Sequence, residues 1–402
     1  MGRGEYEIFS EGKIGHMTLS NRLVRSATWD PSILKSRRMT DQVLHLYKEL
    51  AIGGVGMIIT GGFPVVEEEM LHGRDSAGRP YSYEDIQIEG IARMADEVRG
   101  SAPDCKIVAQ LEVGYLGAGP SDISSPFQKE RIRSLSKEEI RKVVNSFVEA
   151  IVRMKESGFD GIQLHGAHGG LLSCFLSPYT NRRHDEYGGA VKNRARIVRD
   201  IVSEARKKVG DWPILIKMNC TDYVEGGIDT DTFPELAKEI ECSGVDAVEV
   251  SGGMWDCLVR TKEELGFRPV PAPESHTRIS SPHKQSYFLK HAERLDLDIP
   301  VILVGGNRDI ERLEKIVHRG AVDFIALCRP LISEPDLPAR WLEGRGGNRM
   351  DCISCNSCIY SMIVHPGRLE PDVVTCIFKH DKQQHEMAQA WLSTWVEKNI
   401  VT

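Results

Sequence analysis

Short apolar runs recur along the chain, and longer stretches in which apolar residues have helical spacing separate them. Four of the runs begin at Gly54, Gly158, Gly244 and Gly320, and each continues with β-branched residues and then a small or polar residue. This order fits a glycine that ends a helix and leads into a buried strand, and nearly continuous apolar runs are typical of parallel strands covered on both faces. The predicted strands are 23–30, 54–62, 105–114, 158–166, 212–219, 244–252, 299–306 and 320–328.

The intervening stretches predict helices, and Ser136 with Glu139 has the spacing of a capping box at the start of one of them. Eight strands that alternate with helices predict an α/β fold, a (β/α)8 TIM barrel. An open doubly wound sheet is the alternative, but such a sheet usually starts with a glycine-rich dinucleotide fingerprint, which this sequence lacks. The predicted helices are 40–52, 83–99, 136–156, 191–208, 230–242, 282–295 and 309–319.

Three further kinds of segment lie outside the alternating strands and helices: an N-terminal hairpin, two long loops and a C-terminal extension. Residues 6–21 alternate around two glycines and predict a hairpin that closes the bottom of the barrel. Residues 114–135 and 255–280 form long loops, which in a compact domain are usually lids or binding loops. We therefore expect a barrel domain over residues 1–345 and a C-terminal extension over 346–402, with a cysteine cluster and a terminal helix.

Composition narrows the class of protein. The 402 residues are 41% hydrophobic and carry a net charge of −7, and no basic stripe stands out, so nucleic acid is not an expected partner. There is no apolar run long enough to span a membrane and no signal peptide, so we expect a cytoplasmic protein with no membrane partner. Six of the ten cysteines are scattered singly, as reduced intracellular thiols would be.

Polar residues fall near the carboxyl ends of several predicted strands, where barrels place their active sites. Gln110, His165, Lys217 and Ser251 have such positions, and an amide and an ammonium inside a barrel suggest contact with a bound ligand. A satisfied polar layer, or a buried ion pair of Lys217 with Glu249, is the alternative.

Two loops near the end of the barrel suggest a phosphate site. Gly305 and Gly306 follow the seventh predicted strand, and Arg329 follows the eighth. Backbone amides and a cation bind phosphate at this place in barrels. Together these residues suggest a phosphorylated cofactor across the barrel mouth.

His165 and His168 lie among glycines directly after the fourth predicted strand. Imidazoles donate or accept hydrogen bonds near neutral pH, so the pair suggests a site for a polar group of a substrate. Satisfied loop histidines and a metal-binding pair are the alternatives.

Residues 8–343 resemble the old yellow enzyme family of FMN-dependent oxidoreductases. The most specific part is the motif HGAHGGLLSCFLSPYTNRRHDEYGG at 165–189, followed by NRARI at 193–197. LSNRLVRSAT at 19–28, Gln110-Leu111 and CRPLISEPDLP at 328–338 support it.

The resemblance implies a set of FMN contacts and a substrate site. Lys217 would lie near N1 and O2 of the flavin, where it stabilises the charge that develops on reduction. His165 and His168 would bind the carbonyl oxygen of the substrate, and NAD(P)H would be a transient co-substrate. The implied FMN-binding residues are Ser26, Ala27, Thr28, Gly62, Gln110, Lys217, Gly305, Gly306, Cys328 and Arg329.

Two positions depart from the family pattern. Gly170 stands where ene-reductases commonly have a tyrosine acid, and Trp29 stands where relatives often have a cysteine or a threonine. The proton for the substrate therefore needs another source, either Tyr115 or water.

Four cysteines cluster after the barrel. Two residues separate Cys352 from Cys355 and also Cys355 from Cys358, and Cys376 follows later. This set suits a [4Fe–4S] cluster or zinc, and it resembles the branch of the family that contains 2,4-dienoyl-CoA reductases and trimethylamine dehydrogenase. Vestigial and redox-sensitive thiols are the alternatives.

Three functions follow from these features. The first is an FMN-dependent NAD(P)H reductase of activated alkenes, such as enones or enoyl thioesters. The second is an FMN/iron–sulfur dehydrogenase that passes electrons to an external carrier protein. The third is a non-catalytic zinc-bearing interaction protein, which the full set of FMN-like positions disfavours. Trp391, Leu392 and Trp395 in the last stretch pack either on the barrel or on another subunit of a homo-oligomer.

Overall fold

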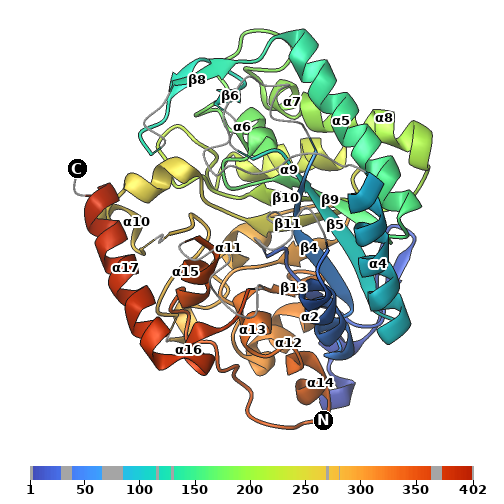
Figure 1. Ribbon diagram of the computed structural model, residues 1–402. Helices are drawn as coiled ribbons and strands as arrows, with labels where there is room; N and C mark the ends of the chain where they lie inside the picture. Colours follow the sequence, from blue (N-terminus) through green and yellow to red (C-terminus); the bar gives the residue numbers. More distant parts are fainter. Residues whose placement is uncertain are drawn as a thin grey trace.

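Eight parallel strands close into a barrel in this computed structural model (Figure 1). The last strand pairs with the first, so the TIM barrel is confirmed and the open-sheet alternative is wrong. The strands are β3 (Leu23–Arg25), β4 (Met57–Pro64), β5 (Lys106–Glu112), β9 (Gly161–Gly166), β10 (Ile214–Asn219), β11 (Ala247–Ser251), β12 (Val301–Leu303) and β13 (Phe324–Leu327). The structure describes residues 3–28, 39–65, 85–114, 117–127, 131–268, 271–279, 281–363 and 374–400.

Helices cover the outside of the barrel, and most lie where the periodicity predicts them. The predicted capping box is confirmed, because Ser136 Oγ accepts from the amide of Glu139 and the Glu139 carboxylate accepts from the amide of Ser136. Among the described residues no helix is both long and apolar enough to cross a bilayer. The main covering helices are α2 (Asp41–Ile52), α4 (Asp85–Ser101), α5 (Lys137–Glu156), α8 (Arg196–Val209), α9 (Phe233–Glu241) and α12 (Ile310–His318).

The helix predicted over 282–295 is wrong in extent. The chain makes a 3-10 turn at Pro282–Lys284 and then only a short helix, α11, at Leu289–Ala292. Between them Ser286 adopts a φ of 50°, and its amide donates to the carbonyl of Gly306 at 3.3 Å. Hydrogen bonds to the loop after β12 therefore override the local helical pattern.

The predicted hairpin consists of β1 (Gly12–Ile14) and β2 (Met17–Leu19), paired antiparallel. Its apolar side chains are buried together with residues of the barrel interior, including Met57 and Phe324. Because both of these residues begin their strands, the hairpin closes the amino-terminal end of the barrel. The opposite end, where the strands finish, is left for a site.

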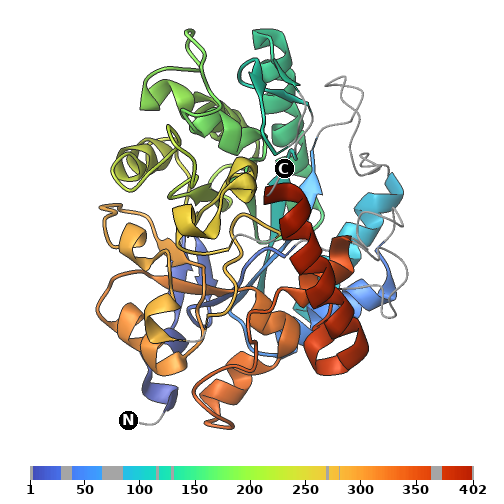
Figure 2. The same ribbon diagram turned by 90° about the vertical axis from the view of Figure 1, so that its left-hand side faces the viewer.

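The C-terminal extension forms α15 (Ser357–Ile363), α16 (Ile377–His380) and α17 (Lys382–Ile400). Figures 1 and 2 show α17 along one side of the molecule, next to α15 and α16. Trp391 of α17 packs edge-on against Tyr360, with ring centroids 5.5 Å apart. Trp29 and Tyr115 lie outside the described residues, as does the side chain of Trp395.

Candidate active site

A pocket with about 550 Å³ of empty space, part of it open to solvent, lies at the carboxyl ends of the barrel strands. The lining includes the predicted site residues Ser26, Ala27, His168, Lys217, Gly305, Gly306, Cys328 and Arg329. Outside the lining are the predicted residues Thr28, Gly62, Gln110 and His165.

Lys217 is held in the pocket wall by a buried ion pair. Its Nζ lies 3.2 Å from Glu249 Oε1 and donates to Ser26 Oγ at 2.9 Å. The two charged side chains face each other because Lys217 and Glu249 are register partners on β10 and β11, and they are only 5% and 0% exposed. The ion pair considered as an alternative is therefore present, and Lys217 also lines the pocket.

A row of amide side chains extends this ion pair across the barrel. Gln163 Nε2 donates to Glu249 Oε2 at 2.7 Å, and Gln110 Nε2 donates to Gln163 Oε1 at 2.8 Å. Gln110 pairs in register with Gly62 of β4. A fully bonded polar layer of this kind fixes the orientation of each member.

Two buried arginines, Arg308 after β12 and Arg329 after β13, line the same pocket. Arg308 donates from Nε and Nη2 to Ser354 Oγ at 3.2 and 3.0 Å. Arg329 donates from Nη1 to the carbonyl of His276 at 2.9 Å and to Asn356 Oδ1 at 2.5 Å. Among the described residues neither guanidinium has a carboxylate partner, although both are nearly fully buried. Because buried charges usually have a counter-charge, the part of the pocket beside them suits an anionic group.

Gly305 and Gly306 form the edge of the same region, and their conformation requires glycine. Their φ angles are 104° and 74°. A Cβ on Gly305 would lie 2.6 Å from the ring of Phe288, and one on Gly306 would lie 2.7 Å from the ring of Tyr287. Because these two residues have no side chains, their backbone atoms line the pocket together with Arg308 and Arg329.

The histidine pair forms a connected polar row at the pocket. His165 Nε2 lies 3.2 Å from His168 Nδ1, and His168 Nε2 lies 2.7 Å from Ser251 Oγ. On the far side, His165 Nδ1 lies 3.4 Å from Glu112 Oε2, a charge contact that is not aligned as a hydrogen bond. Burial, and then the charges of His165 and Lys217, lower the pKa of His168 well below its ordinary value, so its imidazole is neutral near pH 7.

Three acidic or basic groups of this region are absent from the sequence prediction: Glu112, Glu274 and Arg308. Glu274 lines the pocket, and burial raises its pKa. Arg308 directly follows the Gly305–Asn307 segment, so its position after a strand was a usable signal. Glu112 had the same signal, because it ends β5, whereas Glu274 lies in a long loop whose path the sequence does not reveal.

The four late cysteines line a second pocket, which encloses about 330 Å³. Arg329 lines both pockets, so the two share a wall. In the part of the chain that the structure describes, no three His, Cys, Asp or Glu side chains are arranged to hold one metal ion. The cysteine pocket comprises Cys352, Cys355, Cys358 and Cys376 together with residues of α15, α16 and the neighbouring loops.

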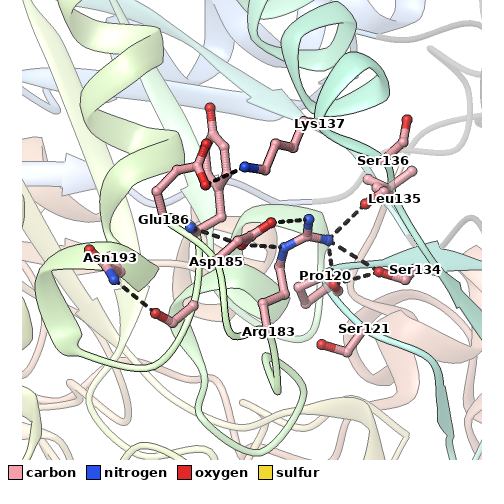
Figure 3. Close-up of polar contacts among 12 residues, drawn as sticks. Pro120, Ser121, Ser134, Leu135, Ser136, Lys137, Arg183, Asp185, Glu186 and Asn193 are labelled. Atoms are coloured by element: carbon pink, nitrogen blue, oxygen red, sulfur yellow. Dashed lines mark hydrogen bonds and ion pairs between the residues drawn. The ribbon is translucent and has the colours of Figure 1, made fainter.

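Charged residues in the long central motif anchor it rather than line the pocket. Arg183 forms two hydrogen bonds with Asp185, at 2.9 and 2.6 Å (Figure 3). Its Nη1 also donates to the carbonyls of Pro120 and Leu135 at 2.9 and 2.7 Å, and to Ser134 Oγ at 3.1 Å. The motif is thus fastened to the loop that follows β5.

Comparison with known proteins shows the family of this chain. The profile of the NADH:flavin oxidoreductase / NADH oxidase family matches residues 7–348. An NADH oxidase of Thermoanaerobacter brockii is 32% identical over 375 residues, which cover 90% of this chain and 55% of that protein. An NADPH dehydrogenase of Bacillus subtilis is 31% identical over 339 residues, which cover 82% of this chain and 92% of that protein.

Among solved structures, a 2-naphthoyl-CoA reductase in complex with 2-naphthoyl-CoA superimposes with a TM-score of 0.76 at 25% identity. The match covers 89% of this chain and 55% of that protein, so the chain spans about half the length of several proteins it matches. The family uses flavin and NAD(P)H. The chain therefore belongs to the NADH:flavin oxidoreductase / NADH oxidase family.

Proposed function

We propose that the protein is an FMN-dependent NAD(P)H oxidoreductase that reduces an activated C=C bond, in an enone or an enoyl thioester. The observation that carries the proposal is the polarity of one pocket. It is lined by two buried arginines that form no ion pair with a carboxylate among the described residues, and also by buried Lys217 and by His168. FMN combines the two matching groups, an anionic phosphate and a redox-active ring.

The residues present fit FMN. The phosphate would be bound by Arg308, Arg329 and the backbone of Gly305 and Gly306, which together supply positive charge and close backbone approach. Lys217 would face the pyrimidine edge of the ring, held there by its ion pair. When bound, FMN accepts hydride from NAD(P)H and supplies it to the substrate.

The histidines would polarise the substrate. His168 is neutral near pH 7, so it donates one N–H and accepts at its other nitrogen. His165 lies beside it at 3.2 Å, and the pair would bind the carbonyl oxygen. Withdrawal of electrons toward that oxygen makes the β-carbon of a conjugated alkene a hydride acceptor.

The proton for the α-carbon must come from a different group, because Gly170 has no side chain. Glu274 supports one route, since it lines the pocket and burial raises its pKa, which favours the protonated acid. Tyr115 and water are the other candidates from the sequence.

Anaerobic half-reactions test the proposal. NADH or NADPH should reduce the bound flavin, and 2-cyclohexenone should then reoxidise it. His165→Ala/His168→Ala should keep FMN bound but lose reoxidation by the enone. If the double variant reoxidises as fast as the parent, the histidines do not bind the carbonyl.

A second candidate is an FMN/iron–sulfur dehydrogenase that passes electrons to a carrier protein. The observation in its favour is that Cys352, Cys355, Cys358 and Cys376 line one pocket, which shares Arg329 with the flavin pocket. A [4Fe–4S] cluster would use these thiolates as ligands. Protein purified anaerobically should then contain about four irons per chain, and Cys355→Ser should remove them. Stoichiometric zinc, or no metal at all, would exclude a cluster.

A further inference from the structure

The loop that carries the cysteines also holds the two arginines of the flavin pocket. Ser354 lies between Cys352 and Cys355, and its Oγ accepts both hydrogen bonds from Arg308. Asn356 follows Cys355, and its Oδ1 accepts from Arg329 at 2.5 Å. Both Ser354 and Asn356 are 1% exposed. The cysteine loop therefore lies outside the pocket lining but contacts both arginines that line it.

The backbone of this loop has an uncommon conformation at the two contact residues. Ser354 and Asn356 have backbone φ angles of 58° and 61°, which residues other than glycine adopt only uncommonly. Such conformations persist where the surrounding structure fixes them. Here the carbonyl of Ser354 accepts from the amide of Arg278 at 3.3 Å, and Asn356 Nδ2 donates to the carbonyl of Ser275 at 3.4 Å. The positive φ angles of Ser354 and Asn356 are thus held by hydrogen bonds to the segment that contains Ser275 and Arg278.

The chemistry of the two contacts suits a site for an anion. A hydroxyl and an amide oxygen orient a guanidinium without cancelling its charge, whereas a carboxylate would neutralise it. Burial lowers the pKa of Arg308, and the charge of Arg329 acts in the same direction. Two like charges that line one pocket are stabilised when an anion binds beside them.

We propose that Ser354 and Asn356 are positioning residues for the phosphate of FMN, so that the cysteine loop sets the preference of the protein for FMN over riboflavin. The inference rests on the proposed FMN site. Because Arg329 and Asn356 also line the cysteine pocket, a change at the cysteines that moves the loop alters FMN affinity, and FMN in turn stabilises the loop.

The test compares two ligands that differ only in the phosphate. The full-length protein, stripped of flavin, is titrated with FMN and with riboflavin, and quenching of flavin fluorescence gives each dissociation constant. The variants are Ser354→Ala and Ser354→Gly, the second of which relieves the positive φ while it also removes the hydroxyl. Ser357→Ala is the matched control, because Ser357 is a fully buried serine at the start of α15, directly after the loop, and it contacts His385 and Gln389 instead of an arginine.

Both Ser354 variants should reduce the ratio of FMN to riboflavin affinity by about tenfold or more, which corresponds to about 1.4 kcal/mol. Riboflavin affinity itself should stay within about twofold, and Ser357→Ala should leave the ratio unchanged. An equal loss for both ligands would mean a general structural role and would overturn the inference. An unchanged ratio in Ser354→Gly would overturn it as well, while the FMN site itself would stand. If the parent protein binds neither flavin, the proposed function fails and the inference fails with it.

Discussion

Replacement of Lys217 by methionine is the most informative single change at the barrel mouth. The side chains are similar in length and both are unbranched, so the change removes the charge and little else. The carboxylate of Glu249 would then be fully buried with only two neutral donors, from Ser26 at 2.6 Å and Gln163 at 2.7 Å.

The expected cost is large because one charge of a buried pair is left alone. Removal of one partner of such a pair typically destabilises a protein by about 3–5 kcal/mol, whereas loss of both charges together is far better tolerated. We therefore expect Lys217→Met to lower the free energy of unfolding by about 3 kcal/mol or more. Lys217→Met/Glu249→Gln should recover at least about 2 kcal/mol of this loss, since the second change removes the stranded charge.

Urea unfolding of the flavin-free protein measures both values. Lys238→Met is the control, because Lys238 pairs with Glu241 at 2.5 Å but its side chain is 49% exposed. An exposed pair contributes about 0–1 kcal/mol, so the control should lose no more than that. A loss below about 1 kcal/mol for Lys217→Met, or no recovery in the double variant, would refute the view that Lys217 and Glu249 act as a buried pair.

Two further predictions concern the walls of the pocket. Burial, and then the charge of Arg329, lower the pKa of His276 to about 3. Between about pH 6.5 and 3 the unfolded state therefore binds a proton at this histidine that the folded state does not. The free energy of unfolding should fall as the pH drops through this window. His276→Phe should reduce the slope of unfolding free energy against pH in this window by up to about 1.4 kcal/mol per pH unit. Equal slopes in the parent and in His276→Phe would contradict the assignment. Gly305→Ala should destabilise the protein by more than about 2 kcal/mol and weaken FMN binding, because its Cβ would overlap an aromatic ring and its φ is positive. Gly210→Ala has a positive φ but no neighbour within 4 Å, so it should cost only about 1 kcal/mol by chemical denaturation; equal losses would argue against the clash.

The barrel was predictable because each strand carries its own signal. The recurring glycine followed by a β-branched run marks one strand at a time, and the alternation with helices then leaves few folds. The segment 282–295 shows the limit of this reasoning. Its apolar spacing is helical, but the amide of Ser286 is used by Gly306 in a loop that only the closed barrel brings near.

The site was predictable in its residue types and in part of its pairings. The ion pair of Lys217 with Glu249 was one of two alternatives from the sequence, and the register that sets the two residues opposite each other decides that it forms. Arg308 was missed although it stands beside the glycine pair, and its contact with Ser354 depends on how the extension folds back. Contacts between residues far apart in the chain leave no local sequence pattern, so they could not be predicted from the sequence alone.

The stoichiometry of the complete reaction tests the central claim most directly. The purified protein is incubated anaerobically with NADH or NADPH and an excess of 2-cyclohexenone, and both the oxidised nicotinamide and the saturated ketone are quantified. One saturated ketone should form for each nicotinamide oxidised, and the activity should be lost when FMN is removed and restored when FMN is returned. Flavin that is reduced by an amine or another donor, but that is never reoxidised by an enone or an enoyl thioester, would show that the protein is not an alkene reductase.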